Sequence, residues 1–192
     1  MMKKLWFAFI GCFLVLTACT GPSADEAQAD LGNITSNTSV EETARRGTAQ
    51  AVSTGNISFI GYGPGKSHEG TFDTWNATLY ESNNSITSAQ VTVDVASLDT
   101  GIGSLDSHLR GEDFFHTEEH PTARFDATTV ENDTATGTLK MHGVTREISF
   151  PLNVTGNSVS SRFNLRLDAF NISHPAITGR ATIIFDLERK TR

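Results

Sequence analysis

Two histidines and two glutamates lie together in the segment His116–His120, which reads HTEEH. The pattern H-x-x-E-H is that of inverted zinc proteases, in which two imidazoles bind the metal and a glutamate acts as general base. That chemistry needs all five residues on one helix, and Pro121 disfavours helical backbone at the residue before it. The sequence therefore predicts no zinc-protease centre in this segment.

A looser metal site is the alternative that the same region leaves open. It would draw its ligands from His108, His116, His120 or Glu119. The simpler interpretation is that these histidines are solvated loop residues. We therefore expect no metal and no cofactor.

Other catalytic patterns are weak. The chain has no G-x-S-x-G elbow, and no strand pattern leads directly into Ser104. The paired acids Glu112–Asp113 and Glu118–Glu119 are typical of solvated turns rather than of a glycosidase pair. These observations favour a binding protein over an enzyme.

The first eighteen residues have the organisation of a secretory signal peptide. Lys3 and Lys4 precede an apolar run over 5–16 that is shorter than the roughly 20 residues of a membrane span. Residues 16–19 resemble a bacterial lipobox, so we expect a lipoprotein-type signal over 1–18 and a lipid anchor on Cys19. Thr20 follows the cysteine where an inner-membrane lipoprotein would have Asp, which implies an outer-membrane address facing the periplasm.

Cleavage after residue 18 leaves 13 basic and 22 acidic side chains, a net charge of −9. Such a surface repels phosphate backbones, so we do not expect a nucleic-acid partner. Residues 19–50 are rich in small polar side chains and show no periodicity, so we expect a lipidated flexible tether with a span of roughly 30 Å. The sequence leaves open whether the domain forms a homodimer.

Residues 51–190 predict one all-β domain. Eight segments have strand character, several with period-two alternation of apolar and polar residues. They cover 51–62, 71–81, 86–96, 123–130, 134–141, 144–155, 158–168 and 176–188. Turn-forming residues between consecutive segments favour an eight-stranded antiparallel barrel or a sandwich.

The long connection between the third and fourth predicted strands breaks this meander. Leu105 and Leu109 are four residues apart and predict a short helix with one buried side. Asp106 and Arg110 would then form an ion pair on its outer side. We expect this helix to close one end of the barrel.

A barrel of eight strands is filled by its own side chains or holds one small ligand. The candidate inward residues are apolar, and without further information a filled core is the favoured interpretation. The candidate lining residues are Phe59, Phe72, Trp75, Val91, Val93, Leu109, Phe114, Phe115, Phe125, Phe150, Phe163 and Phe170.

The run Leu98–Phe125 resembles the signature of the YceI family, and Gly137–Val154 and Arg166–Ile172 resemble two further family segments. The matching positions of the first run are Thr100, Gly101, Asp106, His108, Leu109, Arg110, Asp113, Phe114, Phe115, Pro121 and Phe125. The resemblance implies a lipocalin-like periplasmic barrel whose cavity binds a polyisoprenoid lipid, such as a quinone or a polyprenyl chain, for sequestration or transport in the bacterial envelope. The alternative is a ligand-free barrel that acts in envelope stress or binds a partner. A metal-dependent enzyme is the third hypothesis.

Overall fold

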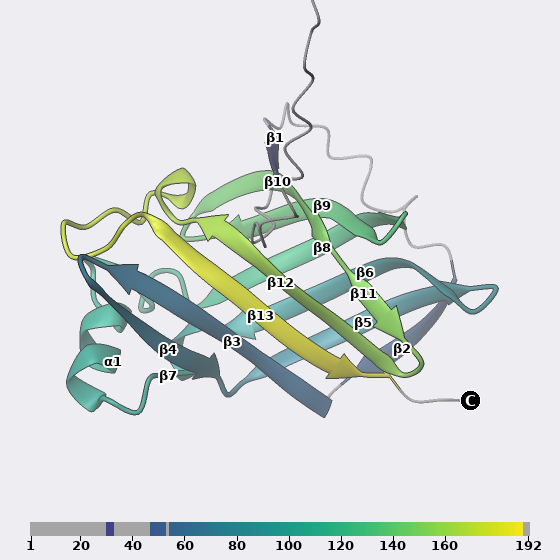
Figure 1. Ribbon diagram of the computed structural model, residues 1–192, viewed down its shortest axis with the longest axis horizontal. Helices are drawn as coiled ribbons and strands as arrows, with labels where there is room; N and C mark the ends of the chain where they lie inside the picture. Colours follow the sequence, from purple (N-terminus) through teal and green to yellow (C-terminus); the bar gives the residue numbers. More distant parts are fainter. Residues whose placement is uncertain (1–29, 33–46, 53, 190–192) are drawn as a thin grey trace, which may run out of the picture.

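The computed structural model describes residues 30–32, 47–52 and 54–189, and there the strands pair into two antiparallel sheets (Figure 1). The first sheet has the order β1 (Asp30–Gly32), β10 (Val144–Pro151), β9 (Thr134–Met141), β8 (Thr122–Glu131), β6 (Ser85–Asp94), β5 (Trp75–Ser82) and β2 (Thr48–Val52). The second has the order β11 (Asn153–Thr155), β12 (Ser158–Arg166), β13 (Arg180–Glu188), β3 (Thr54–Gly63), β4 (Lys66–Phe72) and β7 (Leu98–Asp99).

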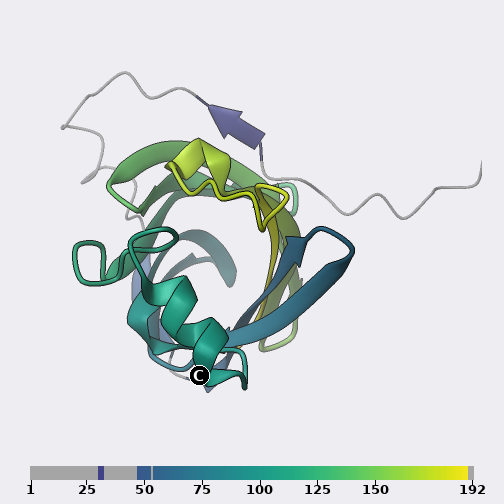
Figure 2. The ribbon, with the colours of Figure 1, turned by 90° about the vertical axis from the view of Figure 1, so that its left-hand side faces the viewer.

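The two sheets face a common interior (Figure 2). The helix α1 (Gly103–Arg110) lies at one end of the molecule, on the side that faces the viewer in Figure 2. Two short 3₁₀ helices, η1 (Val95–Ser97) and η2 (Asp168–Phe170), complete the secondary structure of the described residues. None of the helices described there is long and apolar enough to cross a membrane.

The prediction of an all-β antiparallel fold with one helix after the third predicted strand is confirmed. The eight-strand count was wrong, because the described strands divide into a seven-stranded and a six-stranded sheet. Closure into a single barrel stays a prediction, since the pairing among these strands does not run in one continuous ring.

Some strands were not predicted because their sequences lack an apolar side-chain pattern. They form because their backbones pair with a neighbouring strand. β4 has the sequence KSHEGTF, and it pairs with β3 although most of its residues are polar or glycine. The predicted strand 144–155 is interrupted at Leu152, whose backbone N–H donates to the Asp133 carbonyl at 2.8 Å. Strand boundaries of this kind depend on backbone partners, which are β3 for β4 and Asp133 for Leu152.

β1 and β2 both involve residues that were expected to form the flexible tether over 19–50. β1 pairs with β10 and β2 pairs with β5, each at the edge of the first sheet. The tether prediction is therefore corrected for these residues, and the domain begins before residue 51. The predicted signal peptide and Cys19 lie outside the described residues.

Strand alternation places the core between the sheets. On β10, Ile148 and Phe150 are buried while Glu147, Ser149 and Pro151 are not. The same period of two on the other long strands brings one apolar face of each sheet toward the interior. This confirms the alternation predicted for β10.

The helix α1 is held by polar contacts on its inner side. Asp106 is buried and accepts hydrogen bonds from the backbone N–H of Thr100 at 2.9 Å and from its hydroxyl at 2.6 Å. Arg110 donates to the carbonyl of Ala96 at 2.8 Å and to that of Leu98. The predicted outward ion pair of Asp106 and Arg110 was wrong. Both side chains instead form hydrogen bonds with the segment that precedes the helix.

These contacts also set the charge state of the buried carboxyl group. The hydroxyl and then the backbone N–H of Thr100, helped by the Arg110 charge, hold the pKa of Asp106 below its ordinary value. Each donor favours the ionised form, and partial burial opposes them. The carboxylate is therefore a structural anion at neutral pH.

Gly70 on β4 makes room for an aromatic ring. It pairs with Phe59 on β3, and a Cβ atom at Gly70 would lie 2.5 Å from Cζ of that ring and 3.0 Å from the Asp99 carbonyl oxygen. No real Cβ contact is that short. A larger residue must displace Phe59.

We expect Gly70→Ala to lower the free energy of unfolding by about 1–3 kcal/mol, because the added methyl group overpacks the Phe59 site. Gly103→Ala is the matched control, since a Cβ there meets nothing within 4 Å and the residue lies in α1. We expect it to change stability by less than about 1 kcal/mol, in the stabilising direction. Urea unfolding measures both, and equal effects would contradict the packing argument.

We expect Thr100→Val to raise the pKa of Asp106 toward its ordinary value of 3.8, as measured by NMR titration of the carboxyl group. A lowered folded-state pKa contributes stability that is present above the unfolded-state value and is lost as the pH falls through the folded-state value. The variant should therefore be less stable at neutral pH, and its stability should fall less steeply below about pH 4. Thr155→Val, on the exposed strand β11, should leave the acid dependence unchanged.

Candidate functional site

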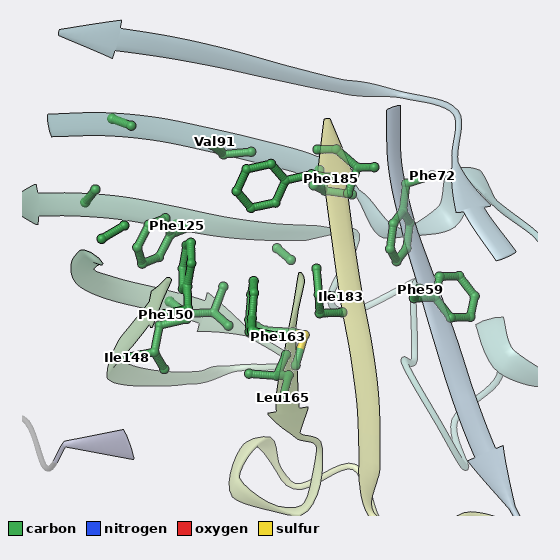
Figure 3. Close-up of a pocket in the computed structure, with 18 of the residues that line it drawn as sticks. Phe59, Phe72, Val91, Phe125, Ile148, Phe150, Phe163, Leu165, Ile183 and Phe185 are labelled. Atoms are coloured by element: carbon green, nitrogen blue, oxygen red, sulfur yellow. The ribbon is translucent and has the colours of Figure 1, made fainter. Parts of the chain in front are cut away.

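An apolar cavity of about 160 Å³ lies between the two sheets (Figure 3). All of the side chains that line it belong to Ala, Val, Ile, Leu, Met or Phe. Most come from strands of both sheets, and the others lie in connections, at Val95, Phe115, Leu152 and Leu167. An apolar cavity of this kind excludes water, because water needs polar partners to be held there.

The period of two explains how the strands form this wall. On β6, the residues Ala89, Val91 and Val93 line the cavity, while Gln90 and Thr92 between them do not. On β13, Ala181, Ile183, Phe185 and Leu187 line it in the same way. Each of these two strands therefore contributes every second side chain.

Four of the phenylalanine rings that line the cavity pack against one another. The rings of Phe150 and Phe163 are stacked with their centroids 4.2 Å apart and their planes nearly parallel. Phe125 and Phe185 lie against Phe150, at centroid distances of 5.1 and 6.1 Å. We call these four residues the aromatic cluster.

A second pair of rings lies apart from the aromatic cluster. Figure 3 shows Phe59 and Phe72 together, away from Phe125 and Phe150, and their ring centroids are 5.2 Å apart. Both rings line the same cavity. The apolar wall thus extends along the interior rather than surrounding a single point.

Most of the lining residues predicted from sequence do line the cavity. They are Phe59, Phe72, Val91, Val93, Phe115, Phe125, Phe150 and Phe163. The prediction that they bind a lipid stays a prediction.

Four predicted residues are placed elsewhere among the described residues. Trp75 and Leu109 are partly buried and pack against the core without lining the cavity. Phe170 is fully buried in η2, and the ring of Phe114 packs between those of His108 and His174, with centroid distances of 4.8 and 4.9 Å. Phe114 and Phe170 lie in connections, where strand alternation gives no guide to direction.

Sequence reasoning missed many aliphatic residues of the wall because it favoured aromatic side chains. Ile148 lies two residues before Phe150, Leu165 lies two residues after Phe163, and both line the cavity. Extending the period-two pattern from each predicted phenylalanine would have found them.

We expect Phe150→Ala to lower the free energy of unfolding by about 3–5 kcal/mol, because a ring that is only 6% exposed and packs against three other rings leaves a cavity when it is removed. Val154→Ala is a suitable control, since Val154 is 39% exposed and should change stability by less than about 0.5 kcal/mol. Urea unfolding monitored by far-UV circular dichroism measures both variants. A loss below about 1 kcal/mol for Phe150→Ala would contradict a packed aromatic cluster.

Solved structures with the same fold are known. One is BcnA of Burkholderia cenocepacia, with a TM-score of 0.60, 22% identity and coverage of 71% of this chain and 96% of that one. Another is described as a polyisoprenoid binding domain from Saccharophagus degradans, with a TM-score of 0.60, 14% identity and coverage of 75% and 98%. At these identities the likeness establishes the fold alone.

Sequence comparison adds the family. A UPF0312 protein of Photorhabdus laumondii is 35% identical over 99 residues, and the protein YceI of Escherichia coli O157:H7 is 34% identical over 99 residues. The chain spans about half the length of these curated relatives, with matches that cover 50% of this chain and 49% of each relative. Residues 36–189 match the family model of the YceI-like domain, and the chain therefore belongs to the YceI-like domain family.

Proposed function

We propose that this protein binds the apolar chain of a polyisoprenoid lipid, such as a quinone or a polyprenyl lipid, in the cavity between its sheets. The observation that carries the proposal is a cavity lined only by apolar side chains. A solved domain with the same fold is described as polyisoprenoid binding, which supports the choice of ligand. The wall offers no acid, base or nucleophile to a bound molecule, so we propose binding rather than catalysis.

The volume of the cavity bears on how a lipid enters. Small-molecule pockets usually measure about 300–1,000 Å³, and this cavity measures about 160 Å³. A chain of several isoprene units must therefore displace side chains of the wall. We propose that the aromatic cluster gives way, because its four rings line the cavity and pack against one another from β8, β10, β12 and β13.

The energetics favour exchange with a membrane. Each methylene group moved out of water gains about 0.8 kcal/mol, so a long chain would bind far too tightly if it came from water. Transfer from one apolar medium to another is close to balanced, which suits loading and release. Acylation of Cys19 in the outer membrane would hold the domain beside such a source, and we propose sequestration or transport in the envelope.

We expect Val91→Phe to abolish lipid retention while the protein still folds. Val91 lines the cavity beside Phe125, its partner on β8, so a larger ring occupies the space of the ligand. The cost in stability should be about 1–3 kcal/mol. The measurement is lipid extraction and mass spectrometry of protein purified from its own membranes, followed by reloading from phospholipid vesicles that contain ubiquinone.

Thr92→Phe is the matched control because it adds the same ring to the next residue of β6, whose partners Asn76 and Arg124 are polar. It should retain lipid at the level of the unmodified protein. If the unmodified protein carried no lipid and took up no ubiquinone, the proposal would fail in favour of a ligand-free barrel.

A further inference from the structure

The segment His116–His120 forms a tight turn that brings its side chains together. His116 has a φ of 44°, which is outside the helical range, so the helix of an inverted zinc protease does not form. The backbone N–H of His120 nevertheless donates to the His116 carbonyl at 2.8 Å, and that of Glu119 donates to it at 3.1 Å. The turn therefore gathers these three side chains as a single helical turn would.

The donor atoms of the turn have a spacing that suits a metal ion. One donor atom from each of His116, Glu119 and His120 lies within 4.8 Å of the other two. Nδ1 of His116 is 3.4 Å from Oε2 of Glu119. Two tetrahedral zinc bonds of about 2.0–2.1 Å separate their donors by roughly 3.4 Å. The pair of His116 and Glu119 thus has the spacing that zinc requires, and His120 offers a donor atom in the same group, within 4.8 Å.

The turn is fixed by hydrogen bonds on both sides. The backbone N–H of Phe115 donates to the Leu109 carbonyl, and that of Thr117 donates to the Arg110 carbonyl, each at 3.0 Å. After the turn, the Pro121 carbonyl accepts from the N–H of Val95 at 2.8 Å. These bonds attach the turn to the end of α1 and to η1. Metal binding therefore needs little further ordering of the backbone.

The His120 ring is also positioned by a neighbouring turn. It lies over Gly143, where a Cβ atom would be 3.2 Å from its Cε1 atom. The ring of His142 packs edge-on against it at a centroid distance of 4.7 Å, and Nδ1 of His142 lies 3.0 Å from the Phe170 carbonyl oxygen. Because Gly143 has a φ of 73°, a side chain there would be strained as well as crowded.

We propose that His116, Glu119 and His120 bind one divalent transition-metal ion of the zinc type, with water completing its coordination and His142 positioning the His120 ring. Two imidazoles and a carboxylate are donors that zinc accepts. Glu118 in the same turn adds negative charge beside the site. The proposal takes up the looser metal site that the sequence left open, against the expectation of no metal, which rested on the interpretation of these histidines as solvated loop residues.

The site adjoins the wall of the cavity. Phe115 lines the cavity and immediately precedes His116. A bound ion therefore fixes the backbone that carries one of the lining rings. The inference is independent of what the cavity holds.

Calorimetric titration of zinc into the full chain, purified in detergent without a histidine tag, tests the site. We expect one zinc ion per chain and a loss of affinity of more than tenfold in His116→Gln/His120→Gln. Glu119→Gln should also weaken binding, and it does not threaten folding because this side chain is 66% exposed. Saturation with zinc should slow hydrogen exchange in residues 111–120, whereas magnesium should not.

His108→Gln/His174→Gln is the matched control because it removes the same number of histidines from the same end of the molecule. Their ring centroids are 5.7 Å apart, and Nδ1 of His174 already accepts the N–H of Ala176 at 3.1 Å. This variant should bind zinc as the unmodified protein does. Equal losses in the two double variants, or no stoichiometric binding to the unmodified chain, would overturn the proposal.

Discussion

The alternation of side chains along paired strands is the constraint on which this structure depends. Each sheet turns one apolar face toward the interior, and the two faces together form a wall without polar side chains. Backbone hydrogen bonds are satisfied within the sheets, so the interior needs no polar partner. A wall of this kind suits apolar chains, which is why we propose a binding role.

Polar contacts hold the segments that leave the sheets at the α1 end. Asp106 and Arg110 use their charges to fasten α1 to the strand end before it. The turn at His116–His120 is joined to the end of that helix by backbone hydrogen bonds. The sheets thus enclose the apolar cavity, and the loops at one end carry the residues of the proposed metal site.

Sequence patterns predicted the long strands of the sheets well. They predicted β4 and the contacts of α1 poorly. The alternation on β10 located Ile148 and Phe150 inside, and the predicted segment 134–141 coincides with β9. β4 escaped prediction because KSHEGTF has no apolar periodicity and is held by its partner β3. Asp106 was predicted to lie on the outer side of the helix because it is four residues from Arg110, a spacing that favours an ion pair. It instead accepts two hydrogen bonds from Thr100.

The sequence by itself determined the fold class, the inward face of the long strands and the presence of a helix after the third predicted strand, because these depend on local periodicity. Only the tertiary structure decided that the strands divide into two sheets and that a cavity remains between them. It also decided that His120 meets His142 from another turn. Vacant volume and contacts between loops arise from residues far apart in the chain, and no local pattern records those distances.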